Sequence, residues 1–224
     1  FEALLPATPC AETLEFRVSV SLKSGGTYAD PATSWYVVTA GDGTEVVFRD
    51  EMEDAGGNEN EWTITSDAGL TTGEWERVDP NGTIYNSQMA APEDDATGGS
   101  QNIKCYVTEN GAVGGSAGSA DVDNGSTSLV SPILEVSGTN GIISYSRWFF
   151  DSQSTDELKT YVSNDDGVSW VFVHSTGSTE SEWETTSFAI ADYVVPTDLI
   201  RVGFVTDDLS PASIVEAGID NFQL

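Results

Sequence analysis

Residues Ile143–Phe150 read ISYSRWFF, and residues Glu157–Ser163 read ELKTYVS. Both are short runs of β-branched and aromatic residues with polar turn residues between them, which is typical of β-strands. Similar runs recur along most of the chain, whereas the apolar spacing of amphipathic helices is nearly absent. The sequence therefore predicts an all-β protein.

About eleven such runs follow one another from residue 45 onward, and segments rich in Gly, Asn, Asp and Ser separate them. Short strands at this spacing predict a two-sheet sandwich of the jelly-roll type. The other predicted strands are Glu45–Asp50, Glu61–Ser66, Glu74–Val78, Ile103–Thr108, Ser126–Val136, Ser169–Ser175, Trp183–Ile190, Ile200–Thr206 and Ala217–Leu224.

The segment before the jelly roll predicts a β-hairpin. Leu14–Leu22 alternates apolar and polar residues, and Ser34–Ala40 follows it after a turn-rich stretch. Because a two-stranded hairpin is marginally stable in water, we expect residues 1–41 to be the tail of a preceding β module or strands that pair with another subunit. The predicted division is therefore 1–41 and 45–224.

Composition excludes several classes of protein. The 224 residues include 37 Asp and Glu against 8 Lys and Arg, a net charge of −29, so a basic surface for nucleic acid cannot form. With 38% hydrophobic and 10% aromatic residues, the chain is too apolar for a disordered acidic tail. No stretch approaches the length of an apolar membrane span, which predicts no membrane insertion. The repulsion among the acidic residues favours a saline medium with divalent cations, so we expect an extracellular or cell-surface location.

Two cysteines, Cys10 and Cys105, are too few for a disulfide framework and too far apart for a CxxC motif. One disulfide between them would join the N-terminal segment to the main body. The alternative is two buried, unreactive thiols.

Seven phrases in order resemble the MAM-like jelly-roll modules that follow catalytic domains, often peptidases, in secreted multidomain bacterial proteins. The likeness covers about residues 45–224. The phrases are FRDEMED (Phe48–Asp54), TGEWERVDPNGT (Thr72–Thr83), APEDDAT (Ala91–Thr97), DVDNGSTSLVSP (Asp121–Pro132), ISYSRWFF (Ile143–Phe150), SNDDGVSW (Ser163–Trp170) and SIVEAGIDNF (Ser213–Phe222).

The resemblance implies a non-catalytic extracellular module that acts by adhesion or by contact with protein or glycan. Its partner would be a neighbouring domain, an identical subunit or an extracellular polymer. One alternative is a subunit of a filament or surface layer that assembles through its N-terminal strands. A secreted hydrolase is the remaining alternative.

Calcium is the cofactor that the composition favours, because this hard cation takes six to eight oxygen ligands. By analogy with the jelly-roll carbohydrate-binding modules that this chain resembles, a structural calcium would join Glu53, with Asp50 or Glu51 beside it, to Asp220 in the last strand. The alternative is a set of solvated acidic strand ends.

A second candidate calcium site lies in DVDNG, where Asp121, Asp123 and Asn124 have the alternate spacing of a calcium loop. The complete twelve-residue pattern and its terminal Glu are missing. From another loop, Glu93, Asp94 and Asp95 could complete the ligand set.

The phrase SNDDGVSW fits an Asp-box turn, in which a short Asp- and Gly-containing loop joins two strands and the Trp packs beneath it. Its residues are Ser163, Asp165, Gly167, Ser169 and Trp170. We interpret this motif as structural.

Catalytic motifs are weak. Ser116 lies in a GxSxG match, but no helix pattern follows and the single histidine, His174, lies in a predicted strand. Exposed tryptophans would favour sugar binding, but core packing is the default for a Trp within or beside a strand. That default applies to Trp62, Trp75, Trp148, Trp170 and Trp183.

Overall fold

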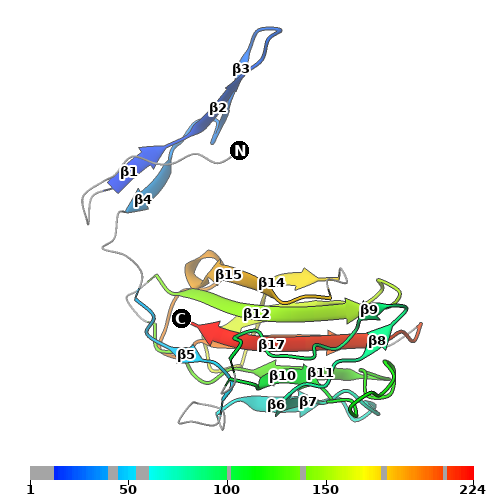
Figure 1. Ribbon diagram of the computed structural model, residues 1–224. Coiled ribbons are helices and arrows are strands. Elements are labelled where there is room, and N and C mark those ends of the chain that lie inside the picture. Colours follow the sequence, from blue (N-terminus) through cyan, green and yellow to red (C-terminus); the bar gives the residue numbers. More distant parts are fainter. Residues whose placement is uncertain are drawn as a thin grey trace. The chain divides into compact units, whose positions relative to one another are not determined.

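The computed structural model describes residues 13–39, 45–53, 61–99, 102–136, 140–177, 181–208 and 211–224 (Figure 1). Two compact units divide the chain, Phe1–Glu45 and Val46–Leu224. We call them the N-terminal unit and the sandwich unit. The predicted division at residues 41–45 lies beside this boundary.

The N-terminal unit is a long antiparallel ribbon. In its described part, β1 (Thr13–Phe16) pairs with β4 (Tyr36–Thr39), and β2 (Val18–Ser21) pairs with β3 (Thr27–Asp30). The predicted hairpin is present, but its turn is shorter than expected. Gly25 and Gly26 have φ values of 90° and 102°, which glycine adopts without a steric penalty, so the chain reverses before Thr27.

Two antiparallel sheets form the sandwich unit, which confirms the predicted all-β class (Figure 1). From β10 to β17 the chain passes repeatedly from one sheet to the other. The six-stranded sheet contains β15 (Glu184–Ala189), β12 (Ile142–Asp151), β17 (Val215–Gln223), β10 (Cys105–Thr108) and β7 (Trp75–Val78) in this order, with β5 (Arg49–Asp50) beside the end of β17. The five-stranded sheet contains β14 (Val171–Thr176), β13 (Leu158–Ser163), β16 (Arg201–Asp207), β11 (Ser126–Val130) and β6 (Thr63–Ser66).

Aromatic side chains from both sheets fill the space between them. The ring of Phe204 on β16 lies 6.4 Å from that of Phe222 on β17 and 4.8 Å from that of Tyr145 on β12. Trp62 meets Phe222 edge to face at 5.3 Å. Because Phe204, Phe222 and Tyr145 are fully buried, these ring contacts join the two sheets into one core.

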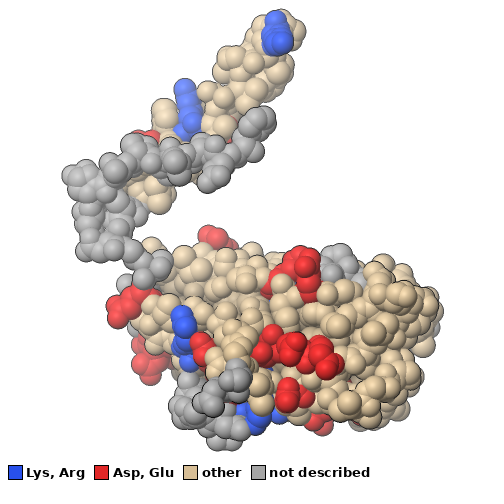
Figure 2. Space-filling model, in the orientation of Figure 1, with Lys and Arg blue, Asp and Glu red and all other residues tan. Residues whose placement is uncertain are grey.

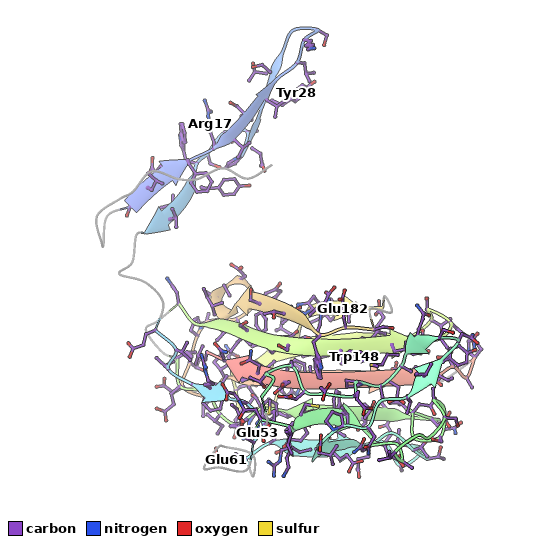
Figure 3. The ribbon with its side chains drawn as sticks, viewed as in Figure 1. Arg17, Tyr28, Glu53, Glu61, Trp148 and Glu182 are labelled. Carbon is purple, nitrogen blue, oxygen red and sulfur yellow. The ribbon has the colours of Figure 1, made fainter. Side chains whose placement is uncertain are left out.

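The outer face of the six-stranded sheet is covered by the chain between β7 and β10, which includes the short hairpin of β8 (Ile84–Tyr85) and β9 (Gln88–Met89). Trp148 on β12, labelled in Figure 3, is 3% exposed, and its indole N–H donates a 2.6 Å hydrogen bond to the carbonyl oxygen of Ala90. The indole N–H of Trp183 donates to the carbonyl oxygen of Asp94 at 2.9 Å. These contacts hold the covering segment against the sheet.

One short 3-10 helix, η1 (Ile190–Asp192), follows β15. Within the described ranges, no helix has the length and hydropathy needed to cross a membrane.

Candidate functional site

The acidic residues near the first and last strands are hydrogen-bond acceptors. Asp50 is 2% exposed and accepts hydrogen bonds from the backbone N–H of Met52 at 2.8 Å and from the indole N–H of Trp62 at 2.9 Å. Glu51 pairs with Arg49 at 3.3 Å. Asp50 therefore fixes the position of a core tryptophan.

Asp220 and Glu53 serve in the same way on the covered face. One oxygen of Asp220 accepts from the backbone N–H of Ala96 at 2.8 Å and from the hydroxyl of Thr97 at 3.0 Å. One oxygen of Glu53, labelled in Figure 3, accepts from the backbone N–H groups of Ile103 and Lys104, each at 2.7 Å. These bonds attach the covering segment to β17 and to the chain that follows β5.

The first predicted calcium site, at Asp50, Glu51, Glu53 and Asp220, stays a prediction. Among the described residues, no three of Asp50, Glu51, Glu53 and Asp220 bring carboxylate oxygens within 4.8 Å of one another.

A three-carboxylate cluster does form around the second predicted site. One oxygen each from Asp121, Asp123 and Asp208 lies within 4.8 Å of the other two. We call these residues the carboxylate triad. Asp121 and Asp123 precede β11, and Asp208 directly follows β16. Because β11 and β16 are antiparallel neighbours, the start of one lies beside the end of the other.

Burial of the triad makes its charge costly. Asp121 is 3% exposed and Asp208 is 1% exposed. Burial, followed by the nearby charge of Asp123, raises the pKa of Asp121 to about 6, and burial also raises the pKa of Asp208. Two unit charges about 5 Å apart at an effective dielectric constant of about 20 repel by about 3 kcal/mol.

Asn124 lies beside the triad, whereas the other three residues predicted for this site lie in the covering segment. Asn124 donates its side-chain N–H to the hydroxyl of Thr71 at 3.0 Å, and its backbone N–H bonds to the carbonyl oxygen of Asp208. In the covering segment, Glu93 accepts from the backbone N–H of Gly82 at 2.7 Å. Asp94 and Asp95 line a separate acidic hollow of about 310 Å³. Within the described ranges, the carboxylate that lies within 4.8 Å of those of Asp121 and Asp123 is that of Asp208, and not that of any of these three.

The five Asp-box residues form one turn between β13 and β14. Asp165 accepts hydrogen bonds from the hydroxyl of Ser163 at 2.8 Å and from the backbone N–H of Ser169 at 2.8 Å. The hydroxyl of Ser169 donates to the second oxygen at 2.6 Å and lowers the pKa of Asp165. Gly167 has a φ of 84°, which favours glycine.

Trp170 differs from the other tryptophans of the sandwich core. Trp62, Trp75 and Trp148 are buried, whereas Trp170 is 38% exposed. Its indole lies across Gly203 in the centre of β16, where a Cβ atom would come within 3.1 Å of the ring. Glycine at this position therefore gives Trp170 room to rest on the sheet.

An apolar groove of about 340 Å³ lies beside this ring on the outer face of the five-stranded sheet. Its floor follows the strand register, since Gly203 faces Tyr161 on β13 and Val205 on β16 faces Ser128 on β11. The lining residues are Thr65, Ser128, Val130, Tyr161, Trp170, Gly203 and Val205. We call this feature the Trp170 groove. The strand pattern offered no signal for it, because the exposure of Trp170 depends on its contact with Gly203.

The histidine has a structural role in this geometry. The ring nitrogen Nε2 of His174 lies 2.8 Å from the hydroxyl of Tyr145, whose oxygen also lies 2.8 Å from that of Thr160. The pKa of His174 is lowered mainly by burial and further by the nearby charge of Arg147. The loop that carries Ser116 has turn geometry, and β11 follows it.

Cys105 is a free, fully buried thiol. Burial, followed by the nearby charge of Asp220, raises its pKa well above the ordinary value. The free thiol of Cys105 agrees with the alternative of buried, unreactive thiols, whereas Cys10 lies outside the described residues, so the disulfide between them stays a prediction.

No family model matches the sequence, and no curated protein is similar to it. Among solved structures, the family 11 carbohydrate-binding module from Clostridium thermocellum, in complex with a β-1,3-1,4-mixed-linked tetrasaccharide, is similar at 13% identity and a TM-score of 0.47, over 80% of this chain and 96% of that one. The K1 cleaved adhesin domain of Lys-gingipain from Porphyromonas gingivalis W83 is similar at 13% identity and a TM-score of 0.42, over 79% and 95%. The module TmCBM61 in complex with β-1,4-galactotriose gives 14% and 0.41, over 78% and 97%. At these values the likeness says nothing about a ligand of this chain.

Glu216 is a buried carboxylate whose cost to stability can be tested. It is 3% exposed on β17, its one hydrogen bond in the described structure is a long 3.5 Å contact from the hydroxyl of Thr108, and burial raises its pKa well above 4.5. A pKa raised in the fold means that the contribution of Glu216 to stability is fully present below about pH 4.5 and is lost as the pH rises through its folded pKa. We expect Glu216→Gln to melt about 2 °C or more above the wild type at pH 7.5 in chelator, and to lose this advantage near pH 4.

The matched control is Glu135→Gln, which removes the same charge at an exposed position. Melting curves by circular dichroism at both pH values make the comparison. A Glu216→Gln protein that melts at or below the wild-type temperature at pH 7.5 would contradict the assignment of Glu216 as a destabilising buried charge.

Proposed function

We propose that the sandwich unit is a non-catalytic binding module that holds an extended neutral polysaccharide in the Trp170 groove. The observation that carries the proposal is the exposed indole of Trp170, which lies across Gly203 next to an apolar groove. Flat aromatic rings of this kind stack on the apolar faces of sugar rings.

The form of the groove suits a chain-like ligand. It crosses four adjacent strands, from Tyr161 on β13 to Thr65 on β6. Three strand spacings of about 4.8 Å give a length of roughly 14 Å, enough for more than one sugar unit. The hydroxyls of Thr65 and Ser128 supply hydrogen-bonding groups beside the apolar surface, as is usual in ligand sites. Phe172, which is 51% exposed and 5.7 Å from the ring of Tyr161, extends the aromatic surface onto β14.

Charge decides between classes of polysaccharide. The chain has a net charge of −29. On the face of the sandwich unit that Figure 2 shows, which carries the covering segment, acidic side chains outnumber basic ones. Lys159, whose strand partner is the groove residue Val205, is paired with Asp207 at 3.4 Å. Arg201 on β16 is paired with Asp166. A polymer of sulfated or uronic sugars would be repelled, so we propose a neutral ligand.

Such a module fits the MAM-like resemblance, in which non-catalytic jelly rolls accompany the enzyme domains of secreted bacterial proteins. We extend the proposal to an extracellular or cell-surface location. There the neighbouring domain would perform the chemistry, and this unit would supply attachment to the polymer.

Trp170→Ala tests the proposal. We expect the full chain to be retarded in native gels that contain one of a panel of soluble neutral polysaccharides, and we expect this substitution to weaken binding to that polysaccharide at least tenfold. A tenfold loss corresponds to about 1.4 kcal/mol, a reasonable contribution for one stacked ring.

The matched control is Tyr193→Ala, because Tyr193 is 37% exposed, outside the groove, and Trp170 is 38% exposed. It should bind as the wild type does. Equal affinity of wild type and Trp170→Ala, or no retardation by any neutral polysaccharide, would reject the groove as a glycan site.

A second function is favoured by the N-terminal unit, which exposes apolar side chains on its strands. In its described part each strand pairs with one neighbour, while Val20 on β2 is 56% exposed and Tyr28 on β3, labelled in Figure 3, is 69% exposed. An apolar ribbon with open edges pairs readily with another strand. We therefore propose that this ribbon adds to a sheet of a preceding domain or of another copy of the chain.

Deletion of residues 1–41 distinguishes between the two proposed partners of the ribbon. If the partner is another copy, sedimentation velocity should show oligomers for the intact chain and a folded monomer for the shortened chain. If the partner is a preceding domain, the intact chain should be monomeric and protease should cleave 14–40 first. A monomer whose residues 14–40 resist protease as well as the sandwich unit does would contradict both versions.

A further inference from the structure

We propose that the carboxylate triad, Asp121, Asp123 and Asp208, binds one hard divalent cation, Ca²⁺. The ion would join the loop that precedes β11 to the loop that follows β16. This site shares no residue with the lining of the Trp170 groove, so the inference does not depend on glycan binding.

An unpartnered oxygen points to the ligand. Among the described residues, the buried Oδ1 atom of Asp208 has no hydrogen-bond partner, and Asp208 itself is 1% exposed. A buried carboxylate oxygen without a donor loses its water and gains nothing in return. A cation bound between the three carboxylates would supply the missing partner.

No basic side chain does this work. All 8 Lys and Arg residues lie in the described ranges, and none forms an ion pair with Asp121, Asp123 or Asp208. Three carboxylates with oxygens within 4.8 Å of one another repel strongly when they are ionised. A divalent cation removes this repulsion.

Hydrogen bonds already hold Asp208 in a fixed orientation. Its Oδ2 atom accepts from the backbone N–H of Ser213 at 2.8 Å, and the hydroxyl of Ser213 donates to Asp151 at 2.7 Å. Burial raises the pKa of Asp151, but bonds from backbone N–H groups and from Ser213 lower it below its usual value overall. Asp151 thus positions Ser213, which positions Asp208 and leaves its Oδ1 atom available.

The two loops are close enough for one ion to join them. The backbone N–H of Asn124 bonds to the carbonyl oxygen of Asp208 at 3.1 Å, and the N–H of Asp208 bonds to the carbonyl oxygen of Gly125 at 3.4 Å. Further along, the N–H of Val122 bonds to the carbonyl oxygen of Val215 at 3.0 Å. The site is therefore preformed by strand pairing.

The donor set favours calcium over other metals. All three side chains offer carboxylate oxygens, which suit hard cations and not metals that prefer thiolate or imidazole. Calcium accepts six to eight oxygens in irregular geometry and readily adds backbone carbonyls and waters, whereas magnesium requires a compact octahedron. Three carboxylates from two loops match the irregular coordination of calcium better than the octahedron of magnesium.

The test compares Asp208→Asn with Asp207→Asn in the full chain. Both substitutions remove one negative charge, but Asp207 pairs with Lys159 and lies outside the triad. After removal of metals with chelator, calorimetric titration with CaCl₂ should show one fewer binding site, or at least tenfold weaker binding at one site, for Asp208→Asn. Asp207→Asn should stay within twofold of the wild type, and MgCl₂ should bind the wild type at least tenfold more weakly.

The change in melting temperature between chelator and excess CaCl₂ is a second readout. If Asp208 had only a structural role, its substitution would not alter this calcium-dependent change. In chelator, Asp208→Asn should melt at or above the wild-type temperature, because it relieves repulsion. In excess CaCl₂, the wild type should melt higher, because an ion that binds the folded state stabilises it.

Two results would overturn the proposal. One is a wild-type chain that binds no Ca²⁺ at millimolar concentration, and the other is an Asp208→Asn chain that binds as many ions as the wild type with affinity within twofold. If Asp208→Asn does not fold, Asp123→Asn decides by the same criteria, since Asp123 is only partly buried. Magnesium binding as tight as calcium would overturn the assignment of the ion.

Discussion

The scarcity of positive charge determines how this sandwich can be built. With 37 acidic and 8 basic residues, most buried carboxylates cannot find a salt-bridge partner, so their oxygens depend on N–H and O–H donors. Asp50 accepts a hydrogen bond from an indole N–H, and Asp220 accepts one from a backbone N–H of the covering segment. Asp151 accepts hydrogen bonds from backbone N–H groups in the turn after β12. Each of these bonds joins segments that the sheets alone leave loose. In the carboxylate triad donors are too few for three carboxylates that lie close together, and that is why we place a cation there.

The same bonds leave the two outer faces of the sandwich different. Bonds to Asp220 and Glu53, together with the indoles of Trp148 and Trp183, hold the covering segment against the six-stranded sheet. On the five-stranded sheet, the Asp-box turn places Trp170 over Gly203 beside an open groove. One face therefore completes the fold, and the other is available for a ligand.

Periodicity was enough to predict the all-β class, the strand runs of the sandwich and the N-terminal hairpin, because alternation and turn residues are local signals. The spacing of Asp121 and Asp123 also indicated two of the three triad residues. Asp208 could not be found this way, since its proximity depends on the pairing of β11 with β16. The hydrogen bonds of Asp50, Glu53 and Asp220 could not be predicted either, because a carboxylate in the sequence does not show which N–H groups will reach it.

The most direct test of this account is a crystal structure of the full chain grown with calcium. The account predicts one ion bound by oxygens of Asp121, Asp123 and Asp208 at about 2.3–2.6 Å, the usual range for calcium, with Asp208 still bonded to Ser213. It also predicts that Asp50 keeps the hydrogen bonds to Met52 and Trp62. A structure in which the three carboxylates hold only water or turn away from one another, while calcium binds between Asp50, Glu53 and Asp220, would contradict it.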